Sequence, residues 1–124
     1  MSLRKALAAA LLLICSGCGS SYSTPSSPSN PGGGGGGTPV SIVSNASNLT
    51  ATAFAPSPVS VQAGGSVTWT NNDNTAHTST ANNGAWNSGS IAPGRSFTMT
   101  FPSAGTFTYH CTIHPGMTGT VTVQ

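Results

Sequence analysis

One local pattern recurs through residues 59–123 of this chain: a small polar residue, usually Thr or Ser, alternates with a large apolar residue. Successive side chains on a β-strand point to opposite faces, so a period of two predicts strands with one buried and one exposed face. Such strands are typical of antiparallel sheets that cover a core on one side. The pattern occurs at residues 59–62, 66–70, 96–101, 106–111 and 120–123. The chain is therefore predicted to be an all-β protein.

Charged residues are almost absent, and their absence excludes several classes of fold and function. They make up 3% of the chain, compared with about 25% in an ordinary globular protein. After residue 5 the only charged side chains are Asp73 and Arg95. Long helices are disfavoured, because the charged residues that usually form helices are missing. A nucleic acid would find no basic surface to bind. A pair of catalytic carboxylates cannot be assembled either. We therefore predict neither a helical bundle, nor nucleic-acid binding, nor carboxylate-pair hydrolysis.

Turn-forming residues separate the predicted strands and define a small folded unit at residues 40–124. Gly, Pro and Asn favour tight reversals, and they cluster at residues 64–65, 71–74, 93–94 and 103–105. Residues 40–43 and Phe54 are expected to add an edge strand. Two such sheets facing each other across their apolar side chains make a β-sandwich.

The first 17 residues are predicted to be a signal peptide. They combine two basic residues, an apolar run at residues 7–14 and a small-residue exit, which is typical of a secretory signal. The apolar run is too short to span the roughly 30 Å hydrocarbon core of a bilayer. The stretch Ile14-Cys15-Ser16-Gly17-Cys18 also resembles a bacterial lipobox, which implies that Cys18 is acylated and becomes the mature N-terminus. The alternative is plain secretion without a lipid.

Residues 18–39 are predicted to be a linker. They are rich in Ser and Pro and contain six consecutive Gly at 32–37. A segment of this composition cannot bury enough apolar surface to offset the entropy lost on ordering. We expect a disordered tether between the anchor at Cys18 and the folded unit.

Four residues could together ligate a metal ion. Cys111 is followed by His114 and then by Met117, each at a spacing of three residues, while His77 follows the turn that ends an earlier strand. Two imidazoles, one thiolate and one thioether form the soft donor set that suits copper in an electron-transfer site. The sequence therefore predicts a mononuclear metal site at these four positions.

Each of these residues also has a purely structural alternative. Cys111 could be an inert buried thiol, or a disulfide partner of one of the two N-terminal cysteines. His77 could be a turn residue, and Met117 could fill the loop. His110 is predicted to stay outside the site, because strand alternation turns it away from the face that carries Cys111. The combination of four suitable donors favours the metal site.

These motifs resemble those of the cupredoxins, the plastocyanin and amicyanin group of blue copper proteins. The resemblance runs from about Phe54 to Gln124 and rests on Val61-x2-Gly64, Val67-x-Trp69-x-Asn71-x-Asp73, His77, Pro93-Gly94 and Cys111-x2-His114-x2-Met117. It implies a Greek-key β-sandwich with one type 1 copper ion. It assigns the copper to equatorial His77, Cys111 and His114 and to a weak axial Met117. Thr78 stands where many members have an Asn that braces the ligand loops.

The resemblance implies a function as well. It points to an electron carrier that cycles the copper between Cu(II) and Cu(I) in the periplasm or on the outer face of a bacterial membrane, and not to an enzyme. The alternative is a copper store or chaperone that delivers the ion. A copper enzyme would need a further metal site or a substrate position, and a structural zinc module is disfavoured because Met is a poor zinc ligand.

Redox partners are expected to dock on an apolar face around His114. The folded unit lacks a charged patch of either sign, so electrostatic steering has little to act on. The uncharged neighbours of His114 in sequence are Ile113, Pro115, Gly116 and Met117. The alternative is that these residues only pack the loop. We expect a monomer, attached to the membrane only through the lipid at Cys18.

Overall fold

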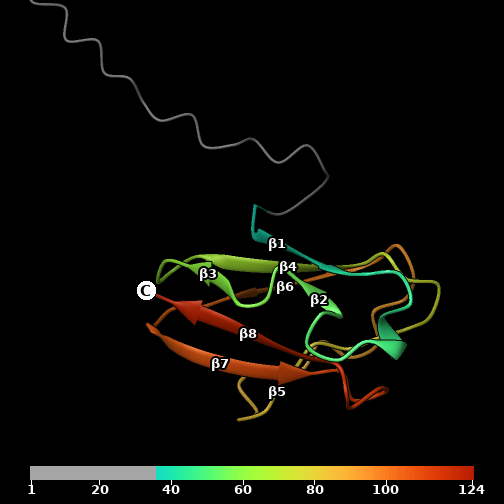
Figure 1. The fold of residues 1–124 in the computed structure, drawn as a ribbon. Coiled ribbons are helices and arrows are strands. Elements are labelled where there is room, and N and C mark those ends of the chain that lie inside the picture. The colour runs from blue at the N-terminus through green and yellow to red at the C-terminus, as the bar shows by residue number, and fades with distance from the viewer. Residues whose placement is uncertain (1–35) are drawn as a thin grey trace, which may run out of the picture.

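The computed structural model describes residues 36–124 (Figure 1). The expected signal peptide at residues 1–17, the acylation site at Cys18 and the linker residues 18–35 lie outside this part of the chain. Between residues 36 and 124, no helix is both long and apolar enough to cross a membrane.

The described residues form a β-sandwich of two four-stranded sheets, which confirms the predicted all-β fold. The elements are β1 (Thr38–Ile42), a 3-10 helix η1 (Ala46–Asn48), β2 (Phe54–Ala55), β3 (Val59–Val61), β4 (Ser66–Asn71), β5 (Thr80–Ala81), β6 (Ser96–Thr100), β7 (Gly105–His110) and β8 (Thr118–Val123). One sheet has the order β2-β1-β4-β6 and the other has the order β3-β8-β7-β5. In Figure 1 the strands β1 and β4 lie above β7 and β8.

The position of the first strand corrects the sequence prediction. Residues 40–43 were expected at a sheet edge, but β1 lies inside its sheet between β2 and β4. It also begins at Thr38, within the range expected for the linker. β1 pairs with β4 in parallel, and β3 pairs with β8 in parallel, whereas purely antiparallel sheets were expected. Each pair joins strands that are not consecutive in the sequence, because a parallel neighbour needs a longer connection that returns the chain to the same end of the sheet.

The apolar side of the strand pattern fills the space between the sheets with aromatic rings. Trp69 and Tyr109 are fully buried and pack edge to face, with ring centroids 5.4 Å apart. Phe54 makes a similar contact with Tyr109 at 4.8 Å. Burial raises the pKa of Tyr109 to about 12, because the interior disfavours a phenolate charge. Met99 lies on the apolar side of the pattern at residues 96–101 but is only half-buried, because β6 is an edge strand.

The hydroxyl side of the pattern forms an uncharged outer face. Three cross-strand pairs on β4 and β6 place their hydroxyl oxygens 2.8 Å apart: Ser66–Thr100, Thr68–Thr98 and Thr70–Ser96. Such opposed hydroxyl pairs stabilise an antiparallel ladder. The outer face of this sheet therefore satisfies its polar groups without charged side chains.

Candidate metal centre

The predicted donors converge at the end of the sandwich where β4 and β7 finish. Cys111 directly follows β7, and His114 lies on the loop that leads to β8. His77 lies between β4 and β5, and its backbone is paired with Ile91: each residue's N–H donates to the other's carbonyl, at 3.2 and 2.8 Å. Residues 34 or more positions apart in the sequence thus meet in one place.

Three donor atoms form a small triangle. The Nδ1 atoms of His77 and His114 are 3.2 Å apart. The Sγ atom of Cys111 lies 3.8 Å from Nδ1 of His77 and 3.9 Å from Nδ1 of His114. An ion about 2.0 Å from each nitrogen and about 2.3 Å from the sulfur can contact all three atoms at these separations. The residues therefore fit a single metal ion, and the thiolate and two imidazoles are ligands that suit copper.

Met117 belongs to the same loop and is fully buried. Its N–H donates to the carbonyl of His114 at 2.9 Å, and its carbonyl accepts from the N–H of Cys111 at 3.1 Å. These two bonds close the loop and tie all three of its predicted ligand residues to one another.

The site is buried except at one histidine. His77 and Cys111 have no exposed surface, while His114 is half-buried. Its neighbours Ile113 and Pro115 are exposed, and Ile113 retains 49% of its accessible surface. An approaching molecule can therefore reach the site most directly through the imidazole of His114.

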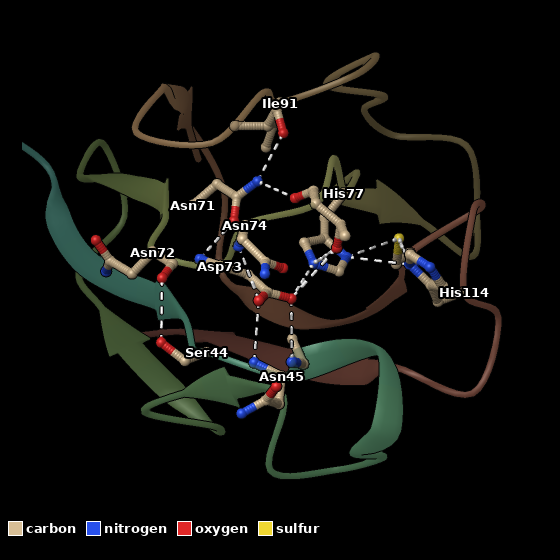
Figure 2. A network of polar contacts seen from close by, with 12 residues as sticks. Ser44, Asn45, Asn71, Asn72, Asp73, Asn74, His77, Ile91 and His114 are labelled. Carbon is tan, nitrogen blue, oxygen red and sulfur yellow. Dashed lines mark hydrogen bonds and ion pairs between the residues drawn. The ribbon is translucent and has the colours of Figure 1, made fainter.

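Asp73 was predicted to lie in a turn and within the cupredoxin-like motif, but it was not predicted to belong to the site. Its Oδ2 atom lies 2.8 Å from Nε2 of His77, and its side chain is almost completely buried. Figure 2 shows the carboxylate below the imidazole of His77, on the side away from His114. The spacing of four residues between the chain's only acid and a candidate ligand was the available signal, but an isolated Asp-His pair in a turn is too common to be decisive.

The hydrogen bonds of this carboxylate keep it ionised. Its contact with His77 lowers the pKa of Asp73 well below its ordinary value, and the N–H groups of Asn74 and Asn45 act in the same direction against the cost of burial. An ionised carboxylate can only accept hydrogen bonds. The proton of a neutral His77 imidazole is therefore assigned to Nε2, which leaves the lone pair of Nδ1 facing Cys111 and His114.

Thr78 joins the two loops that carry the donors. Its hydroxyl oxygen accepts from the N–H of Thr112 at 2.8 Å, and its own N–H points at Sγ of Cys111 at 3.3 Å. The hydroxyl therefore supplies a bracing contact where many cupredoxins have an Asn side chain.

Replacing Thr78 with Val is expected to loosen this connection. The N–H of Thr112 loses its acceptor, and we expect a loss of about 1 kcal/mol in the free energy of unfolding of the metal-free protein. Urea denaturation measures this loss. Thr78→Ser retains the hydroxyl and should remain closer to wild type, so equal stabilities for the Val and wild-type proteins would contradict the bracing role.

His110 stays outside the site, in agreement with the strand phase. Its Nδ1 atom lies 2.6 Å from Oδ1 of Asn82 on the outer face of the second sheet. The three-residue cluster of candidate ligands in the described residues contains His77, Cys111 and His114, and not His110.

Comparisons with known proteins agree with this geometry. Residues 41–124 match the family model of copper-binding proteins of the plastocyanin/azurin family. The chain is 38% identical to plastocyanin of Scenedesmus fuscus over 87 residues, which cover 60% of this chain and 89% of that protein. It is 35% identical over 104 residues to a chloroplastic plastocyanin of Tetradesmus obliquus, with 68% of this chain and 72% of that one covered.

Solved structures agree as well. A purple cupredoxin from Nitrosopumilus maritimus is similar with a TM-score of 0.65 and 29% identity, over 70% of this chain and 99% of that one. A reduced Cu(I) form of an amicyanin variant is similar with a TM-score of 0.61 and 26% identity, over 74% of this chain and 86% of that one. The two-sheet fold, the clustered His and Cys donors and the matched residues lead to one conclusion. This chain belongs to the plastocyanin/azurin family of copper-binding proteins, the cupredoxins.

Proposed function

We propose that this protein transfers single electrons by means of one type 1 copper ion held by His77, Cys111, His114 and Met117. The observation that carries the proposal is the triangle of two Nδ1 atoms and one Sγ atom, with sides of 3.2, 3.8 and 3.9 Å. When bound, copper supplies a one-electron couple between Cu(II) and Cu(I). Membership of a copper-binding family supports the choice of metal.

The surroundings of the triangle suit repeated electron transfer. His77 is fixed by Asp73 and by the backbone of Ile91, and the loop of Cys111 is closed by its bonds with Met117. Donors held in this way keep one arrangement when the charge of the ion changes, so little reorganisation accompanies each transfer. The same burial argues against an enzyme, because it leaves little room beside the donors for a substrate.

Addition of Cu(II) to the metal-free protein tests the proposal. We expect an intense visible band from charge transfer between the thiolate and Cu(II), together with a reversible one-electron wave in voltammetry. A colourless Cu(I) complex that passes its metal rapidly to a chelator would contradict electron transfer and would support the copper store or chaperone instead.

The half-buried His114 is proposed as the point where electrons enter and leave. Ile113, Pro115 and Gly116 around it are exposed and uncharged, which favours docking through an apolar face. Such contacts should be insensitive to salt, because screening acts only on charges. Electron self-exchange between oxidised and reduced copies of the protein probes this face without a partner of known identity.

Replacing Gly116 with Lys is expected to slow self-exchange about tenfold at low salt, because two like charges then meet across the contact. A Cβ atom at Gly116 meets only the methyl group of Thr50, at 4.0 Å, so the change should leave the fold intact. NMR line broadening in mixtures of the two oxidation states measures the rate. Gln62→Lys adds the same charge near the opposite end of the sandwich as a control. A wild-type rate that depends steeply on salt, or equal rates for the two variants, would contradict docking at His114.

We also propose that the domain is exported and held at the outer face of a bacterial membrane or in the periplasm by a lipid on Cys18. In this proposal the segment between Cys18 and β1 is the tether, and the domain itself is monomeric. The lipobox-like stretch before Cys18 supports the anchor. Metabolic labelling with a fatty-acid analogue should mark the wild-type protein but not Cys18→Ala. Equal labelling of both proteins would contradict the anchor, and light scattering of a detergent-solubilised sample measures the oligomeric state.

A further inference from the structure

The only carboxylate side chain of this protein lies at the candidate copper site. The sequence contains a single acidic residue, and its side chain is 4% exposed. A buried charge is costly unless hydrogen bonds or an opposite charge compensate it. The one other charged side chain in the described residues, Arg95, is exposed and directly precedes β6. The location of Asp73 therefore calls for a role beyond solubility or surface charge.

The contacts of Asp73 hold the carboxylate in one orientation. Oδ1 accepts from the N–H groups of Asn45 and Asn74, at 3.0 and 2.8 Å, and Oδ2 accepts from the N–H of Ala46 at 3.2 Å. The hydroxyl of Thr75 lies 3.3 Å from Oδ2. Figure 2 shows Asn45 and Asn74 on the side of the carboxylate away from the imidazole, whereas the Thr75 hydroxyl also lies 3.2 Å from Nε2 of His77. Oδ2 is thereby left aimed at Nε2 of His77, with little freedom to turn away.

We propose that Asp73 is a positioning residue that orients His77 toward the copper and shifts the preference of the site toward Cu(II). The proposal rests on the electron-transfer function proposed above. An acceptor at Nε2 holds the proton there and directs the lone pair of Nδ1 into the triangle of donors. Partners of this kind also raise the basicity of a ligating imidazole, which strengthens binding to the more highly charged ion.

The balance of buried charge acts in the same direction. With the thiolate of Cys111 and the carboxylate of Asp73, the site is neutral when it holds Cu(II) and carries one negative charge when it holds Cu(I). An uncompensated charge is disfavoured where little water can solvate it. Removing the carboxylate charge should therefore favour Cu(I) over Cu(II).

Asp73→Asn tests the effect on the copper. This variant keeps the size of the side chain and one acceptor oxygen but removes the charge. Loss of a partner of a metal ligand costs about 10- to 100-fold in affinity. We expect this loss to fall mainly on Cu(II). The reduction potential of the copper would then rise by about 60–120 mV, because each tenfold change in the affinity for Cu(II) relative to Cu(I) corresponds to about 59 mV for a one-electron couple. The visible band should persist, because the thiolate is unchanged.

A second variant distinguishes the contact between Asp73 and His77 from the net charge near the site. Adding Asn74→Asp to Asp73→Asn restores the net charge at an exposed neighbouring position that does not contact His77. We expect the double variant to keep most of the raised potential. A double variant with the wild-type potential, or a blue Asp73→Asn protein with an unchanged potential, would overturn the proposal.

The tautomer of His77 gives a readout that does not depend on copper or on a folded variant. Nitrogen-15 NMR of the metal-free wild-type protein at neutral pH should show the proton of His77 on Nε2. A proton on Nδ1, or an even mixture of tautomers, would overturn the positioning role. A wild-type protein without the visible band would refute the proposed function instead, and the tautomer would still decide whether Asp73 orients His77.

Discussion

Replacing Cys111 with Ala is expected to abolish the visible charge-transfer band of the copper-loaded protein completely. The band requires a thiolate bound to Cu(II), and Cys111 is the only cysteine among residues 36–124. Its Sγ atom lies within 3.9 Å of both imidazole donors, so no other group in the described domain can take its place. Visible absorption after addition of Cu(II) measures the effect, and a variant that still shows the band would contradict the assignment.

Two further variants make this result specific. Cys111→Ser keeps the size of the side chain, which distinguishes loss of the thiolate from loss of packing, and it should also lack the band. Met117→Ala should keep both the copper and the visible band, but its reduction potential should change. The reason is that a long axial bond affects the potential of the copper more than it contributes to binding the ion. Complete loss of copper from the Met117 variant would contradict a weak axial role.

Replacing Gly119 with Ala is expected to destabilise the fold by about 3 kcal/mol, since overpacking a core costs about 1–3 kcal/mol and occasionally more. Gly119 on β8 is paired with Tyr109 on β7, and the phenol ring lies over it. A Cβ atom at this position would overlap the ring and hydroxyl of Tyr109. The ring cannot easily move, because Trp69 and Phe54 pack against it. Urea denaturation of the metal-free protein measures the loss.

Gly116→Ala is the matched control for this prediction. It introduces the same methyl group three residues earlier, on the loop before β8, where the nearest atom outside its chain neighbours lies 4.0 Å away. Its effect on the free energy of unfolding should stay within about 0.5 kcal/mol. A similar loss in both variants would mean that the loss does not come from overlap with the ring of Tyr109.

Much of the fold follows from local patterns. Alternation of Thr with apolar residues predicted β4, β6, β7 and β8, because the faces of a strand depend only on the parity of the residue number. The same parity separated His110 from Cys111 correctly. Two strands were predicted less well. β5 has two residues, too few for any period to be recognised, and β1 was predicted but was given the wrong position in its sheet.

Part of the ligand triangle could also be predicted from the spacing of nearby residues. Cys111 and His114 lie on one short loop, so their spacing restricts how far apart they can be. His77 was identified through its place after a strand end and through the resemblance to cupredoxins. The number and softness of these donors point to copper without any coordinates.

By itself, the sequence determined which residues face the core, which lie on turns and which can bind a soft metal, since each of these properties is read from neighbouring positions. Only the tertiary structure decided that β1 lies inside its sheet, that Thr78 bridges two loops, and that Asp73 is buried against His77. The physical reason is that these features are contacts between distant segments. Strand order and buried polar pairs depend on how the whole chain closes around its core, and hydrogen bonds such as that of Asp73 with Asn45, 28 residues away, leave no periodic mark in the sequence.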